Sequence, residues 1–139
     1  MTAPVSGSSS NARWLAVAVG GLTLVLGLLA LLYPERMLGW LGFAILSPTN
    51  AAAGLGEIRA TYGGLFAVIG VVTLLAALDP PMHRDRLLLV ALLWFGVAGG
   101  RLLGLMVDGN PGLFGWIYLA VETALGGAML VAWFTASEY

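Results

Sequence analysis

Residues Leu87 to Val107 read LLLVALLWFGVAGGRLLGLMV, an apolar run that holds a single charged side chain, Arg101. A helix needs about 20 mostly apolar residues to cross the hydrocarbon core of a bilayer. The segment before the run is DPPMHRDR and the segment after it is DGNPG, and both are rich in residues that favour loops and turns. The sequence therefore predicts a transmembrane helix over this run.

Three other apolar runs have the same character. They cover residues 14–32, 57–78 and 113–134. Pro34 ends the first run and Pro80 ends the second. The first run follows Arg13, which is also the pattern of a secretory signal, but it is longer than the apolar region of a signal and lacks a small-residue cleavage motif. We predict that it is an uncleaved first span and that the fold is all-α, a bundle of four transmembrane helices.

The composition also favours a membrane protein. Hydrophobic residues make up 60% of the 139 residues and charged residues make up 9%, whereas soluble domains average about 45–50% and about 25%. A soluble chain of this length could not bury so much apolar surface. We expect a single four-helix transmembrane domain over 13–139, preceded by a disordered tail over 1–12 (MTAPVSGSSSNA).

Charge and residue types argue against several function classes. The net charge of −1 provides no basic field that could hold nucleic acid. The chain has no cysteine and a single histidine, His83, so we predict neither a metal site nor a cofactor. A Ser-His-Asp set, an HExxH motif and a P-loop are absent from the sequence. We therefore expect no catalytic residues and a protein that is not an enzyme.

The segment between the first two spans is apolar but too short to cross a bilayer. Residues 35–46 read ERMLGWLGFAIL. Trp40 and Phe43 suit the headgroup level, where aromatic side chains are enriched. These features predict a short interfacial or re-entrant helix, closed by the sequence SPTN at 47–50. An ordinary loop is the alternative.

Basic residues in the short loops predict the orientation. If four spans are present, Arg13, Arg84 and Arg86 fall on one side of the membrane and Arg36 falls on the other. Basic residues concentrate in cytoplasmic loops. The sequence therefore predicts that both termini are cytoplasmic.

Six side chains are expected to form a polar cluster in the outer half of the bundle. They are Glu57, Arg59, Tyr62, Arg101, Asp108 and Glu122. In the predicted topology the second span begins at the outer face, the third ends there and the fourth begins there. Ionisable residues inside spans are functional-site candidates by default, although buried pairs also serve to fix helix register.

Arg101 and Glu122 form the predicted base of this cluster. A tight turn joins their spans, so the two helices must be neighbours. Because Cα–Cβ bonds tilt toward the N-terminus of a helix, Arg101 leans deeper into the membrane and Glu122 leans back toward the outside. We expect a buried ion pair between them, with Tyr118 one helical turn before Glu122. Asp108 is expected to pair with Arg59 of the second span.

Glycines provide a second pattern. Gly96, Gly100 and Gly104 are spaced by four residues, a stripe of small residues that permits close approach of helices. Packing within the chain is the favoured use of this stripe, and a dimer face is the alternative. Gly63 and Gly64 would let a neighbouring helix approach the second span.

The chain resembles a family of small four-pass bacterial membrane proteins, the domain of unknown function 4345. The resemblance rests on the sequences EIRA at 57–60 and YGG at 62–64, on GRLLG at 100–104 with Asp108-Gly109, and on Glu122. It implies a bacterial inner-membrane protein with four spans. It implies no activity, because the family has none assigned.

Two functions fit these observations. The first is a non-enzymatic accessory or structural subunit of a larger membrane complex, whose partners are the lipid bilayer and other membrane chains or further copies of itself. The alternative is a binder or carrier of a small lipophilic or anionic ligand, anchored by Arg59 and Arg101. A proton-coupled transporter that uses Glu122 is less favoured, because such carriers usually contain two repeats.

Overall fold

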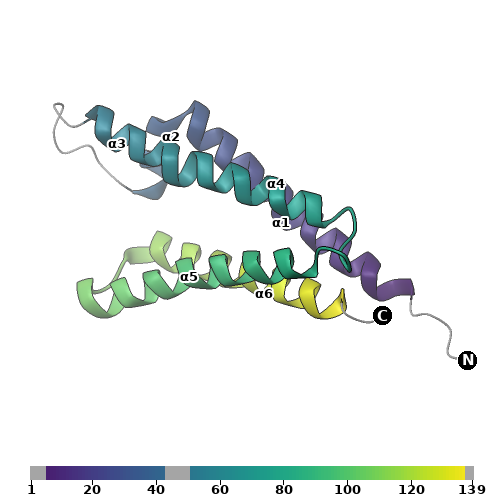
Figure 1. Cartoon of the computed structure of the whole chain (residues 1–139). Helices are drawn as coiled ribbons and strands as arrows, with labels where there is room; N and C mark the ends of the chain where they lie inside the picture. The colour runs from purple at the N-terminus through teal and green to yellow at the C-terminus, as the bar shows by residue number, and fades with distance from the viewer. Residues whose placement is uncertain (1–5, 43–50, 137–139) are drawn as a thin grey trace, which may run out of the picture. The chain divides into compact units, whose positions relative to one another are not determined.

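The structure, a computed structural model, describes residues 6–42 and 51–136, and every regular element in this part is a helix. The elements are α1 (Ser6–Leu32), α2 (Pro34–Leu41), α3 (Ala51–Glu57), the π-helical segment η2 (Ile58–Leu65), α4 (Phe66–Ala76), α5 (Arg84–Asp108) and α6 (Gly112–Thr135) (Figure 1). The predicted all-α fold is confirmed.

Four stretches are long and apolar enough to cross a membrane. They are Ser9–Leu32, Ala51–Ala76, Arg84–Asp108 and Gly112–Thr135. The second stretch begins earlier than the predicted residue 57, because the helix already starts at Ala51 and continues through η2. Alanine has the highest helix propensity, and the three alanines at 51–53 account for the earlier start. The four predicted spans are therefore present as helices.

The chain divides into two compact units. Unit 1 comprises Met1–Val19 with Thr73–Tyr139, and unit 2 comprises Gly20–Val72. Both α1 and α4 contribute residues to each unit, so each boundary falls inside a continuous helix. The single four-helix domain over 13–139 stays a prediction.

Unit 1 contains the antiparallel hairpin of α5 and α6, which lie side by side (Figure 1). Its buried side chains include Leu87, Ala91, Trp94 and Ala98 on α5, and Leu125, Met129 and Ala132 on α6 with Ala136 just after it. They are spaced alternately by three and four residues, which places them on one stripe of each helix. Gly126 adds a close contact, since a Cβ built on it would lie 3.0 Å from the ring of Phe95.

One end of unit 1 gathers three parts of the chain. Arg13 on α1 donates from Nε to the Ala77 carbonyl at 3.1 Å and from Nη2 to the Leu78 carbonyl at 3.4 Å. Arg84 at the start of α5 donates to the Trp133 carbonyl at 3.3 Å, and its guanidinium lies 4.3 Å from the Trp133 ring centroid. The start of α1, the α4–α5 turn and the end of α6 therefore share this end, as the predicted topology requires of Arg13 and Arg84.

The predicted disordered tail over 1–12 is wrong from residue 6 onward. Helix α1 begins at Ser6, and Ala12 is fully buried. The polar composition suggested disorder, but the contacts of Arg13 with the α4–α5 turn fix the first turns of the helix against the rest of unit 1. The first five residues lie outside the described part of the chain.

In unit 2, glycines bring α1 close to the second candidate span. A Cβ built on Gly70 would lie 2.7 Å from Cα of Leu24, and one built on Gly63 would lie 2.8 Å from the Leu31 side chain. A Cβ built on Gly27 would meet the Ala67 backbone at 2.9 Å from its Cα. The expected role of Gly63 in close helix approach is thus confirmed within this unit.

The short helix predicted between the first two spans is confirmed as α2. It begins at Pro34 and ends at Leu41, because Gly42 adopts a left-handed conformation with φ 73° and its backbone N–H bonds back into the last turn. Met37 packs with Ala30 and Ile58 in a small apolar core. Trp40 is 56% exposed, and its position at the headgroup level stays a prediction. Phe43 and the predicted closing sequence at 47–50 lie outside the described residues.

Candidate functional site

The best-defined polar feature of unit 1 is the ion pair of Arg101 and Glu122. Arg101 donates from Nε to Oε2 of Glu122 at 2.8 Å and from Nη2 to Oε1 at 2.5 Å. Glu122 is buried, with 6% of its surface exposed, and the side chain of Arg101 is 27% exposed. The predicted pair is therefore present, in the two-pronged geometry that gives arginine–carboxylate pairs their strength.

The local sequence explains why these two side chains meet. Arg101 continues the three-and-four spacing of the buried stripe on α5, three residues after Ala98. Glu122 continues the stripe on α6, three residues before Leu125. Each charge therefore occupies a position that the hairpin would otherwise fill with an apolar side chain. The turn between the helices sets the register that brings both to the same level.

The turn itself is held by Asn110. Its Oδ1 accepts hydrogen bonds from the Gly112 backbone N–H at 3.0 Å and from Trp116 Nε1 at 3.3 Å. The first bond satisfies a backbone N–H at the start of α6, where such groups have no helical partner, and the second ties the Trp116 side chain to the turn. We did not predict this role for Asn110, although the sequence DGNPG carries the signal for a turn that an asparagine side chain closes.

Tyr118 forms the third part of the site. The Cζ atom of Arg101 lies 5.3 Å from the centroid of the Tyr118 ring. An aromatic face attracts a guanidinium, and the attraction grows when water is excluded. Arg101 is thus bound to the Glu122 carboxylate along one edge of its guanidinium and forms a cation–π contact with the Tyr118 ring.

The arrangement limits what the pair can do chemically. Both carboxylate oxygens of Glu122 accept hydrogen bonds from Arg101, so the acid is already engaged by a permanent cation. A general base needs a carboxylate oxygen directed at the proton that it removes. The geometry instead resembles an internal cross-link between two helices. In a bilayer, an isolated charge at the centre of a span costs about 2.5–3.5 kcal/mol on insertion scales, and pairing offsets that cost.

The four other predicted site residues do not all belong to the same unit. Asp108 is the last residue of α5 in unit 1 and is exposed. Glu57, Arg59 and Tyr62 belong to unit 2. A single cluster of all six residues, and the pairing of Asp108 with Arg59, therefore stay predictions.

Within unit 2 the three residues have partners of their own. Arg59 donates from Nε to the Leu31 carbonyl at 3.3 Å, which satisfies an acceptor in the last turn of α1. Thr61 donates to Oε1 of Glu57 at 2.9 Å, one turn along the helix. Tyr62 packs against the small core of Ala30, Met37 and Ile58. All three lie at or inside η2, and π-helical segments are frequent at functional sites.

Residues 11–133 match the sequence profile of the family described as Domain of unknown function (DUF4345). No curated protein and no solved structure matches the chain.

Proposed function

The chain belongs to the DUF4345 family, and we propose that it is a non-enzymatic accessory or structural subunit of a larger membrane complex. The observation that supports this most is the closed pair of Arg101 and Glu122. The two charges satisfy each other at the buried face of the α5–α6 hairpin. Such a pair fixes the register of two helices and presents neither charge as a reactive group.

A face of α5 supports the association with other chains. Gly96 and Gly100 point away from α6, since no described atom of unit 1 lies within 4 Å of a Cβ built on either one. The α5–α6 pair packs closely at Gly126 and Phe95 instead, and the packing of the stripe elsewhere within the chain stays a prediction. Large apolar side chains border the stripe, among them Leu103, which is 60% exposed. In a bilayer, small residues on such a face let a second helix approach closely.

Bulky substitutions in this stripe test the proposal. Gly96→Leu combined with Gly100→Leu is expected to leave the hairpin folded and to abolish association with the partner chains, because the added side chains would hold a second helix away. Native mass spectrometry of the gently extracted protein measures the association. Gly127→Leu is the matched control, since Gly127 on α6 also has no atom within 4 Å of a built Cβ. A wild-type protein that emerges as a stable monomer without other chains would overturn the proposal.

We also propose an orientation in a bacterial inner membrane, with both termini in the cytoplasm. The chain has no cysteine, so single-cysteine variants can be labelled without background. Met82→Cys in the α4–α5 turn is expected to react with an impermeant maleimide only after the membrane is permeabilised, because Met82 is 76% exposed on the proposed inner side. Pro111→Cys in the α5–α6 turn should react in intact cells. The reverse pattern would contradict this orientation.

A further inference from the structure

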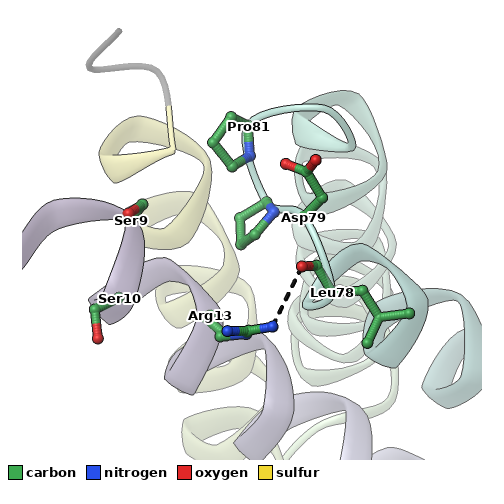
Figure 2. A pocket seen from close by; sticks show the side chains of 7 residues that line it. Ser9, Ser10, Arg13, Leu78, Asp79 and Pro81 are labelled. Carbon is green, nitrogen blue, oxygen red and sulfur yellow. Dashed lines mark hydrogen bonds between the residues drawn. The ribbon is translucent and has the colours of Figure 1, made fainter. Parts of the chain in front are cut away.

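A polar pocket lies at the end of unit 1 that contains the α4–α5 turn. Its volume is about 330 Å³, and its lining consists of Ser9, Ser10, Arg13, Leu78, Asp79, Pro80 and Pro81. Sites for small ligands commonly occupy about 300–1,000 Å³. Figure 2 shows the serines on α1, Asp79 and Pro81 on the facing turn, and the guanidinium of Arg13 extending toward Leu78. The pocket belongs to neither the ion-pair site nor the α5 stripe.

The pocket contains one charge of each sign, and these charges do not neutralise each other. Arg13 and Asp79, both within the described part of unit 1, form no ion pair. Arg13 uses Nε and Nη2 to bind the Ala77 and Leu78 carbonyls, and its Nη1 has no partner among the described residues. Asp79 accepts from the Met82 N–H through Oδ1 at 3.2 Å, and its Oδ2 likewise has no described partner. A donor and an acceptor of opposite charge thus remain available.

The location of the pocket indicates a lipid. One candidate span begins at Ser9 and another ends at Ala76, so the pocket lies where two apolar segments leave the hydrocarbon layer. Leu78, which lines it, and Trp14, which follows Arg13, are each 67% exposed. Basic side chains between transmembrane helices bind the phosphates of lipid headgroups, and Arg13 supplies one here. Exposed apolar side chains beside the pocket provide a surface for an acyl chain.

We propose that this pocket binds the phosphoethanolamine headgroup of a phospholipid, with the phosphate at Arg13 and the ammonium at Asp79. A guanidinium pairs well with phosphate oxygens. An ionised carboxylate accepts hydrogen bonds from a primary ammonium. A glycerol headgroup carries no cation for Asp79, and a choline headgroup carries a cation without N–H donors. The two charges therefore favour ethanolamine over both.

Competition among lipid classes tests this proposal on the full chain. The protein is placed in nanodiscs that hold equal amounts of phosphatidylethanolamine, phosphatidylglycerol and phosphatidylcholine with the same acyl chains, and the lipids retained after detergent extraction are measured by native mass spectrometry. We expect a several-fold excess of the ethanolamine lipid. Equal retention of the three classes, or an excess of the glycerol lipid, would overturn the proposal.

Asp79→Asn identifies the residue that carries the selectivity. Asparagine keeps an oxygen that can accept from the Met82 N–H, so the turn retains its hydrogen bond while the charge is lost. The preference for the ethanolamine lipid should disappear and the glycerol lipid should be retained at least as well. Asp85→Asn is the matched control, because Asp85 is an exposed acid of the same end that does not line the pocket. An unchanged preference in Asp79→Asn would remove Asp79 from the site.

A soluble competitor distinguishes a lipid from a free metabolite. Excess O-phosphoethanolamine is added to the protein before extraction. The lipid should stay bound, because its acyl chains contribute contacts that the soluble headgroup lacks. Displacement of the lipid by the soluble compound would assign the pocket to a phosphorylated metabolite and would overturn the proposal of a lipid.

Discussion

Replacing Arg101 by methionine is expected to destabilise the α5–α6 hairpin by about 3–5 kcal/mol, the usual cost of removing one partner of a buried ion pair. The carboxylate of Glu122 would remain at a position that is 6% exposed, without the two hydrogen bonds that it now accepts. Glu122→Leu should also destabilise the hairpin, because it leaves the guanidinium of Arg101 without its carboxylate. Unfolding in detergent, followed by tryptophan fluorescence, measures both effects.

The double variant Arg101→Met with Glu122→Leu decides between the two roles of the pair. Buried ion pairs can often be replaced by apolar side chains of similar volume with little loss of stability. If the pair is structural, the double variant should regain most of the stability lost in either single variant and should still associate with partners. Arg86→Met is the matched control, since Arg86 is exposed and should change the unfolding free energy by less than about 0.5 kcal/mol.

A different result would support the ligand-binding alternative. In that case Arg101→Met would fold normally and lose a small molecule that co-purifies with the wild-type protein. Normal folding of both single variants would show that the cross-link does not stabilise the hairpin, and the proposal of a structural subunit would lose its main support.

Gly70→Ala is expected to destabilise unit 2 by about 1–3 kcal/mol, the range for overpacking a close contact. The new methyl group would lie 2.7 Å from both Cα and Cβ of Leu24. Because one of these atoms belongs to the backbone, the contact can be relieved only if the two helices move apart. The same fluorescence-detected unfolding measures the loss.

Gly21→Ala is the control for this substitution. Gly21 lies on α1 in the same unit, and no atom lies within 4 Å of a Cβ built on it. Alanine is favoured over glycine inside a helix by about 1 kcal/mol, so this variant should be as stable as the wild type or more stable. If the two substitutions had equal effects, the close approach of α1 and α4 at Gly70 would be refuted.

The fold was largely accessible from the sequence because the signal for a span is local. Four apolar runs, the prolines that end two of them and the turn sequence DGNPG are enough to predict four helices and a hairpin. The short helix α2 was predicted for a similar reason, although it ends at Leu41 where Gly42 turns the chain. The start of α1 was placed too late, because a polar composition does not reveal a contact with residues 77 and 78.

The pair of Arg101 and Glu122 was also predictable, since a short turn fixes both the neighbour and the level of each side chain. The glycines at which the helices pack closely could not be predicted in the same way. The sequence favoured Gly96, Gly100 and Gly104 as a packing stripe, but in unit 1 the hairpin uses Gly126. The choice depends on the rotation of each helix about its own axis, and every helix of a membrane bundle offers several apolar faces that composition alone does not distinguish.

By itself, the sequence determined that this protein is helical, that four of its segments can cross a membrane, and that Arg101 and Glu122 form an ion pair between the last two helices. Only the tertiary structure decided that Arg59 binds the Leu31 carbonyl, that Arg13 fastens α1 to the α4–α5 turn, and that Asp79 shares a pocket with Arg13. The physical reason is the range of the interactions. Hydropathy and turn chemistry act over a few neighbouring residues, whereas these contacts join residues that are far apart in the chain and meet only after the helices pack.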